Sequence, residues 1–113
     1  MYYSIGALQS SESEIIYDKN AIKEFNQFDM IVQKDFVSYI KTLEQEGELK
    51  FPEARKITKD IFEIRVHQDG SYSGFYAYIK HPDIVILHFF QKKSQKTPIK
   101  NIKTAIHRLR YYR

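Results

Sequence analysis

The sequence has 113 residues, of which 42% are hydrophobic and 28% charged, and it contains no cysteine. This length and composition predict one folded domain around a modest core, and they exclude a disordered chain, a disulfide framework and a thiolate metal site. No apolar run approaches the roughly 20 residues that a membrane-spanning helix needs. The first residues lack the pattern of a signal peptide, so we expect a cytoplasmic protein.

The charge is divided unevenly along the chain. Residues 1–54 contain five Lys/Arg and ten Asp/Glu, a net charge of −5, whereas residues 55–113 contain thirteen and four, a net charge of +9. The two values sum to the overall charge of +4. A strongly basic second half indicates an anionic partner, with nucleic acid as the first candidate and an acidic protein as the alternative.

The acidic first half is predicted to supply a short strand and two helices that serve packing. Residues 14–17 are typical of a strand, and Asn20 is expected to cap a helix that begins at about Ala21. A second helix is predicted over 30–46, because its apolar residues recur at spacings of four, three, one and three. Gly47 stands where that helix should end. No chemistry is visible in this pair of helices.

The basic second half is predicted to form a three-stranded antiparallel meander beside a short edge strand at 55–58. Apolar and polar residues alternate over 61–67, so the two kinds face opposite sides of a strand. Asp69-Gly70 predicts a hairpin that leads to the strand 73–80. A second turn then leads to the strand 84–91. The first half of that strand is apolar and rich in β-branched and aromatic residues, which is typical of a strand buried on both faces.

A lysine-rich segment, 92–97, follows this buried strand. Such a segment is usually a solvated connection, but at the end of a rigid strand it can also hold cations where a phosphate binds. Thr97 is expected to cap a last helix in which Pro98 is the first residue. Apolar residues at spacings of three, four and three give that helix one face for docking on the sheet or on another helix.

Polar side chains from neighbouring strands are predicted to meet on one face of the sheet. The alternation puts Glu63, Arg65 and His67 on the same side of their strand, and the lysine-rich segment leaves the end of a neighbouring strand. A concave face with these cations is suited to bind phosphates, and tyrosines beside it are suited to stack on bases. The candidates are Arg65, Lys92, Lys93, Gln95, Lys96, Tyr72, Tyr76 and Tyr78.

Plainer interpretations exist for these residues. Arg65 can pair with Glu63 or Asp60 at the surface, and an alternating aromatic such as Tyr76 is more often part of a core. His88 lies inside the apolar run, where a core histidine is more common than a catalyst. The chain has no glycine-rich phosphate loop, no nucleophile elbow and no His/Asp/Glu set at metal-ligand spacing.

Three segments carry a resemblance to a known family. They are Phe62-Glu63-Ile64-Arg65, Gly70-Ser71-Tyr72 with Phe75-Tyr76, and the run from Leu87 to Pro98, which contains Lys-Lys-Ser-Gln-Lys-Thr-Pro. In these segments the chain resembles the HigB-like, phage-derived branch of the RelE/ParE toxin superfamily. The resemblance covers about residues 55–113, and the order of the earlier strand and helices is compatible with it.

The resemblance implies a small α+β protein, in which an N-terminal strand and a helical hairpin pack on a twisted antiparallel sheet with a C-terminal helix. It implies the toxin of a type II toxin–antitoxin pair, which a helix-turn-helix antitoxin blocks. Toxins of this kind are ribosome-dependent endoribonucleases that cleave mRNA without a metal. In that chemistry a ribose 2′-OH attacks the adjacent phosphate, while cations stabilise the transition state.

The resemblance also suggests roles for single residues. Arg65, Lys92 and Lys93 would hold the scissile phosphate, and His88 or Tyr76 would transfer protons. The residues expected to bind RNA are Lys96, Gln95, Tyr72, Arg55 and Lys56.

One departure from the family concerns a cation. The family usually has an arginine directly after the tyrosine that Tyr72 matches, whereas this chain has Ser73 and then Gly74. Removal of one preorganised donor typically lowers a rate about 10²–10³-fold. Arg55 or Lys56 is then the expected substitute for the missing arginine.

Two alternatives to a nuclease remain open. Ser73 favours a degenerate toxin that only binds its antitoxin or RNA, and so does Phe89, which stands where the family usually has a small residue. A toxin directed at DNA gyrase, as in some relatives, is the other alternative.

Overall fold

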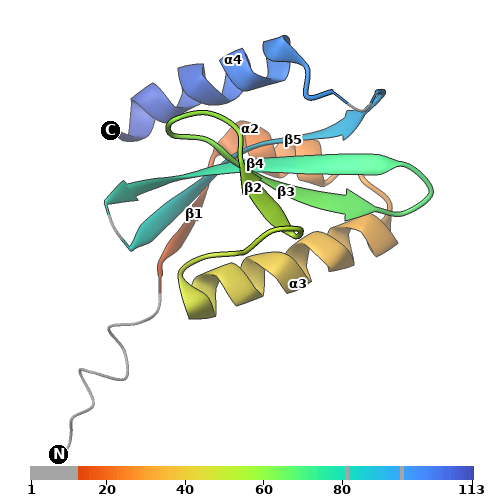
Figure 1. Ribbon diagram of the computed structural model, residues 1–113, viewed down its shortest axis with the longest axis horizontal. Helices are drawn as coiled ribbons and strands as arrows, with labels where there is room; N and C mark the ends of the chain where they lie inside the picture. Colours follow the sequence, from red (N-terminus) through yellow and green to blue (C-terminus); the bar gives the residue numbers. More distant parts are fainter. Residues whose placement is uncertain (1–12, 81, 95) are drawn as a thin grey trace, which may run out of the picture.

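The computed structural model describes residues 13–80, 82–94 and 96–113 and contains a five-stranded sheet with helices on both sides (Figure 1). The strands are β1 (Ile15–Tyr17), β2 (Ala54–Lys56), β3 (Phe62–His67), β4 (Ser71–Lys80) and β5 (Asp83–Lys92), in the spatial order β1-β5-β4-β3-β2. The helices are α2 (Lys19–Phe25), α3 (Met30–Glu46), α4 (Ile99–Leu109) and the 3-10 helix η1 (Arg110–Tyr112). No helix within these ranges has the length and apolar character needed to cross a membrane.

The sheet confirms the predicted α+β class and meander, with one addition. β3, β4 and β5 pair antiparallel in chain order. In the first turn Asp69 and Gly70 have φ angles of 51° and 138°, a backbone that suits these two residue types. β1 pairs with β5 in parallel, with Ile15 opposite Ile84, so the sheet is mixed and not wholly antiparallel. A strand of three residues is too short for its partner to be inferred from alternation.

The helices lie on the two sides of the sheet and divide each strand into two sets of side chains. α3 and α4 are seen on opposite sides in Figure 1. One face packs on α2 and α3 around a core that includes Phe36, Ile64 and Phe89. The other face packs on α4, where Ala105 and Leu109 join a second core. We call these the α3 face and the α4 face.

The ends of the helices confirm one prediction and correct two. α3 has the predicted bounds, and Gly47 ends it with a φ of 81°. Asp18, not Asn20, caps α2, because its carboxylate accepts hydrogen bonds from N–H groups of the first turn. Pro98, not Thr97, is the residue before the first turn of α4, and Thr97 uses its hydroxyl elsewhere.

Gly74 of β4 decides how the α3 face packs. It lies opposite Phe89 of β5. A Cβ atom at Gly74 would lie 2.9 Å from a ring carbon of Phe89 and 3.2 Å from one of Phe36. The rings of Phe36 and Phe89 meet edge to face, with centroids 5.0 Å apart. The large Phe89 therefore fills the room that Gly74 leaves.

Glu24 of α2 joins the helices to the edge of β5. β1 pairs with β5 only as far as Tyr17, opposite Ile86. Beyond that point side chains, and not a strand, bind the backbone groups of β5. The N–H of Phe89 donates to Glu24 at 3.1 Å, and Arg108 of α4 donates to the carbonyl of Leu87 at 2.8 Å. Arg108 and Glu24 also form a two-pronged pair, with N–O distances of 3.0 and 2.8 Å. A carboxylate and a guanidinium thus satisfy backbone groups at a strand edge.

Candidate functional site

Cross-strand pairing places the strand arginine and the first lysine of the lysine-rich segment on the same face of the sheet. Arg65 of β3 lies opposite Ser73 of β4. In the next row His67 lies opposite Ser71, which lies opposite Lys92 of β5. Both rows belong to the α4 face and lie at the end of the sheet near the turn between β3 and β4. We call this region the basic face.

Glu63 is the centre of a charged network beside these rows. Its side chain is fully buried, and Nε of Arg55 lies 3.0 Å from Oε1. The hydroxyl of Ser73 donates to Oε2 at 2.6 Å, and Nζ of Lys92 lies 3.3 Å from the same oxygen. Arg55 also donates to the hydroxyl of Thr97 at 3.3 Å. The network therefore ties β2, β3, β4 and β5 to the segment before α4.

The Glu63 carboxylate is ionised although it is buried. Burial acts to raise its pKa, but the hydrogen bonds from Ser73 and Arg55 and the charge of Lys92 act in the other direction and leave the pKa below the usual 4.5. Lys92 in turn has only 3% of its side chain exposed. Its ammonium group is therefore used inside the protein, which corrects its predicted contact with the phosphate.

Three cations at or beside the basic face remain available to a ligand. Arg65 is half-buried, and Lys93 and Lys96 are exposed directly after β5. In the described part of the chain, none of their charged groups forms an ion pair or a hydrogen bond. Gln95, the other predicted member of this segment, lies outside the described residues.

His67 is a member of the basic face for which the sequence predicted no role. Its side chain is exposed, and Nδ1 lies 3.1 Å from Oγ of Ser71. It shares one side of β3 with Arg65, two residues away, so the two side chains are neighbours. The alternation along β3 already indicated that His67 and Arg65 share one side of the strand. Because the four histidines are scattered along the chain, no histidine motif pointed to His67.

The tyrosines lie on the α3 face, which corrects their predicted place in the site. Tyr76 is 1% exposed and stacks on Phe62, with ring centroids 5.3 Å apart. Burial raises the pKa of Tyr76, so the phenol keeps its proton and is unsuited to proton transfer. Tyr72 packs against Phe28, with ring centroids 5.0 Å apart.

Of the two substitute cations, only Arg55 lies on the α4 side of the sheet. Lys56 is the next residue of β2 and lies on the opposite side, with Nζ 5.9 Å from the centroid of the Phe62 ring. Arg55 is held by Glu63, and 39% of its side chain is exposed. Arg55 therefore stays at the site as a cation that already has protein partners, whereas Lys56 is removed from the site.

His88 is held in place by two helices and does not reach the basic face as a free imidazole. It is 7% exposed. Its Nδ1 lies 2.9 Å from Oε1 of Glu24, and its Nε2 lies 2.8 Å from the side-chain nitrogen of Asn101. Both ring nitrogens are occupied, which corrects the predicted role of His88 in proton transfer.

The structure also adds residues that the sequence did not assign. Glu63, Ser73 and Thr97 take part in the network beside the basic face. The sequence suggested Glu63 only as a surface partner of Arg65, Ser73 only as the place of a missing cation, and Thr97 only as a helix cap. Their partners are far apart in sequence, so no local pattern indicated them. No three His, Asp or Glu side chains in the described ranges converge as a metal site.

The chain matches the model of a known protein family. The model of the family described as "Phage derived protein Gp49-like (DUF891)" matches residues 23–110, which is most of the chain. None of the curated proteins compared with the chain matches it.

Solved structures of RelE proteins resemble this chain in fold. An arginine-to-alanine double mutant of the E. coli toxin RelE in the free state has a TM-score of 0.67 at 12% identity, covering 87% of this chain and 98% of that one. The isolated E. coli RelE toxin gives 0.59 at 13% identity, covering 86% and 98%. The RelB–RelE antitoxin–toxin complex from Methanococcus jannaschii gives 0.58 at 18% identity, covering 74% and 99%. At such low identity the likeness shows a shared fold.

Proposed function

The chain belongs to the Gp49-like family of phage-derived proteins, and from this premise we propose that it is the toxin of a type II toxin–antitoxin pair. Its proposed activity is the cleavage of mRNA on the ribosome by an endoribonuclease that needs no metal. Support comes from the family, from the fold that it shares with RelE toxins, and from the cations of the basic face.

The proposed reaction is attack of a ribose 2′-oxygen on the adjacent phosphorus, with loss of the 5′-oxygen of the next nucleotide. Arg65 and Lys93 hold the scissile phosphate and offset the charge that builds up in the transition state. Lys96 binds the flanking backbone. One proton leaves the 2′-OH and one reaches the 5′-oxygen, and His67 is the imidazole placed to transfer one of them. In this proposal His67 replaces His88 and Tyr76, which the resemblance suggested for proton transfer.

The observation that carries this proposal is the shared face of Arg65 and His67 on β3, with the Glu63 network beside it. Glu63 holds Arg55 and Lys92 in place through an ion network that spans four strands. Because β3 is part of the sheet, the backbone that carries Arg65 and His67 is in place before the substrate arrives and needs little reorganisation during the reaction.

The test is induced expression in bacterial cells, with growth and mRNA fragments as readouts. We expect growth arrest and cleavage of translated mRNA. Arg65→Ala and Lys93→Ala should each reduce cleavage at least about 100-fold, the usual cost of one preorganised donor. Lys56→Ala is the matched control, because it removes an exposed lysine from the other side of the sheet. Full toxicity in both site variants would contradict the assignment of these residues.

A toxin-fold module that binds without cleaving is the second candidate. It is favoured by the Glu63 network, which neutralises Lys92 and part of Arg55, and by Ser73, which offers no cation where the family usually has an arginine. On this alternative, induction yields no mRNA fragments although the protein still binds RNA. Strong cleavage by the native chain would exclude it.

An antitoxin is the proposed protein partner. The M. jannaschii structure is a complex of RelB with RelE, and this chain shares the fold. A small helix-turn-helix protein encoded beside this chain should relieve growth arrest when the two are expressed together. Arrest that persists despite complex formation would contradict this partner.

A further inference from the structure

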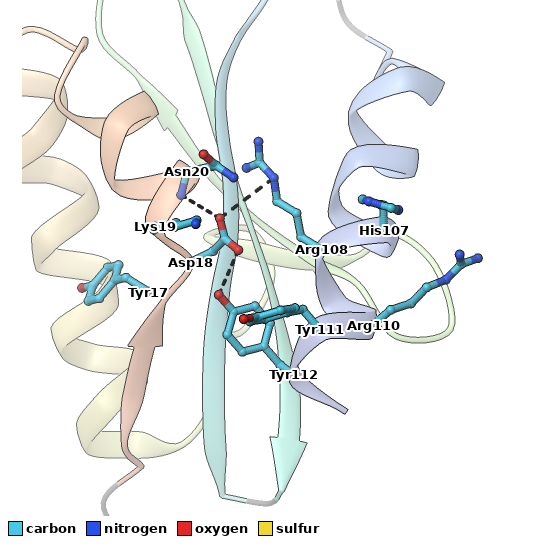
Figure 2. A pocket seen from close by; sticks show the side chains of 9 residues that line it. All are labelled: Tyr17, Asp18, Lys19, Asn20, His107, Arg108, Arg110, Tyr111 and Tyr112. Carbon is cyan, nitrogen blue, oxygen red and sulfur yellow. Dashed lines mark hydrogen bonds and ion pairs between the residues drawn. The ribbon is translucent and has the colours of Figure 1, made fainter.

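A pocket of about 630 Å³ lies away from the basic face, between the junction of β1 with α2 and the C-terminal end of α4 with η1 (Figure 2). Its size is that of pockets that bind small ligands. Two segments far apart in sequence line it. Lys19 lies on one side, and His107, Arg110 and Tyr111 lie on the other. None of these residues belongs to the site proposed above.

The charge of this pocket favours an anion. Its single carboxylate, Asp18, is already engaged: one oxygen accepts from the N–H of Asn20 at 2.8 Å and the other from the hydroxyl of Tyr112 at 2.9 Å. Arg108 is committed to Glu24.

Three polar side chains at the pocket are not held by other side chains and are available to a ligand. In the described part of the chain, Lys19, His107 and Arg110 form no ion pair or side-chain hydrogen bond. An anionic ligand would therefore meet two uncommitted cations and an imidazole, with no free carboxylate to repel it.

An exposed aromatic ring completes the pocket. Tyr111 is 87% exposed, and its ring meets that of Tyr112 edge to face with centroids 5.5 Å apart. A ring this open beside cations is the arrangement on which nucleic-acid bases stack. The Tyr112 hydroxyl donates to Asp18, which holds the ring against which Tyr111 packs.

A stripe of basic side chains leads from the lysine-rich segment to this pocket. Lys100, Lys103, His107 and Arg110 recur at spacings of three, four and three, and all four are exposed along α4 and into η1. Residues 84–113 contain no Asp or Glu at all. Ten residues of helix span about 15 Å, so the stripe covers that distance from the end of the lysine-rich segment to the pocket residue Arg110.

We propose that this pocket binds a nucleotide, with the base on Tyr111 and the phosphate on the uncommitted cations of the lining, chiefly Arg110. The nucleotide is either free or part of an RNA strand that follows the basic stripe. The second source rests on the proposed function, whereas the first does not.

The test is calorimetric titration of the full chain with AMP, adenosine, inorganic phosphate and a 2′-O-methyl RNA hexamer. The methylated RNA has no 2′-OH to attack, so binding is measured without cleavage. We expect saturable binding of AMP, the hexamer or both, with adenosine and phosphate at least about tenfold weaker than AMP where AMP binds.

Arg110→Glu and Tyr111→Ala should each weaken binding about tenfold or more, in the range of one stacked base or one charged contact. Binding of AMP assigns a free nucleotide, and binding of the hexamer alone assigns an RNA strand.

Matched controls separate the pocket from general charge and surface effects. Lys41→Glu reverses an exposed charge on α3, and Phe51→Ala removes a ring that is 76% exposed elsewhere. Both should leave binding unchanged. The two pocket variants and the two controls should all keep the melting temperature of the native chain. Absence of saturable binding by AMP and by the hexamer, or equal binding by the pocket variants and the native chain, would overturn the proposal. Arg65→Ala tests the nuclease separately, because it should reduce cleavage at least about 100-fold and leave AMP binding intact.

Discussion

Ser73 and Gly74 show how departures from a family pattern are accommodated at single residues. The Ser73 hydroxyl is fully buried and donates to Glu63, so this position serves the ion network and not the surface. Gly74 leaves the room that Phe89 fills. Two departures that looked independent in sequence, a glycine in one strand and a large residue in the next, are thus one packing solution.

Gly74→Ala should destabilise the fold by about 1–3 kcal/mol, the usual cost of overpacking a filled core. The new methyl group would meet Phe89 and Phe36 together, so neither ring has free space to move into. Urea unfolding of the purified chain measures the change. Phe89→Leu in the same chain should recover part of the loss, and losses that simply add would contradict the contact.

Glu63→Gln should lower the free energy of unfolding by about 3–5 kcal/mol, because it leaves the ammonium of Lys92 buried without a counter-charge. Urea unfolding at pH 7 provides the measurement, with the exposed Glu48→Gln as a control that should change little. Lys92→Met added to Glu63→Gln should restore part of the stability. A loss below about 1 kcal/mol would show that the network is not a stabilising feature.

At the scale of elements, Glu24 links parts of the fold that the chain itself keeps far apart. Its carboxylate, on α2, holds His88 of β5 and Arg108 of α4 at once. α2 has only seven residues, so its position depends on these contacts more than on its own helical stability. The same contacts fix α4, which carries the basic stripe along its length.

The stability of the fold should fall in acid as Glu24 becomes protonated. Burial acts to raise the pKa of Glu24, but its hydrogen bonds to His88 and Arg108 prevail and lower the pKa from 4.5 to about 2. A lowered pKa in the folded state stabilises the fold above the unfolded value, and this contribution is lost as the pH falls from about 4.5 to about 2. Its size is on the order of 3 kcal/mol.

Unfolding measured between pH 7 and pH 2 tests this expectation. Glu24→Gln should flatten the pH dependence over the acid range, and the exposed Glu46→Gln should not. An acid transition of equal size in the native chain and in Glu24→Gln would show that other carboxylates cause it.

At the scale of the whole molecule, charge and packing are separated along the chain. The acidic first half supplies the helices of the α3 face, and the basic second half supplies the meander, the lysine-rich segment and α4. Of the cations in the second half, Arg55, Arg65 and Lys92 share the α4 face, and the basic stripe follows along α4. This arrangement favours a long polyanion over a small anion, because successive phosphates can be bound by successive side chains.

RNA binding should weaken steeply with salt. Each phosphate contact to single-stranded RNA contributes about −0.7 to the slope of log K against log salt. Arg65, Lys93 and Lys96 alone predict a slope of about −2. Lys93→Ala should reduce its magnitude by about 0.7, and Lys56→Ala should leave it unchanged. Titration of the 2′-O-methyl hexamer at several salt concentrations measures the slope, and a salt-independent affinity would rule out phosphate contacts.

Much of the fold follows from local sequence. The spacing of apolar residues predicted the bounds of α3, and Asp69-Gly70 predicted the hairpin. The alternation along β3 placed Arg65 and His67 on one side of their strand, as the structure has them. These features depend on residues close together in the chain, so a pattern of period 2 or 3.6 is enough to specify them.

Tertiary structure alone decided which side of the sheet each functional side chain serves and which charges remain free. Alternation shows that a strand has two sides, but only the docking of α3 and α4 determines which core covers each of them, and this placed Tyr76 and Lys56 away from the basic face. The partners of Glu63 come from three other strands, so Lys92 could be recognised as buried only once the sheet was assembled. A side chain's charge is written in the sequence, but whether that charge meets solvent or a counter-ion depends on segments far away along the chain.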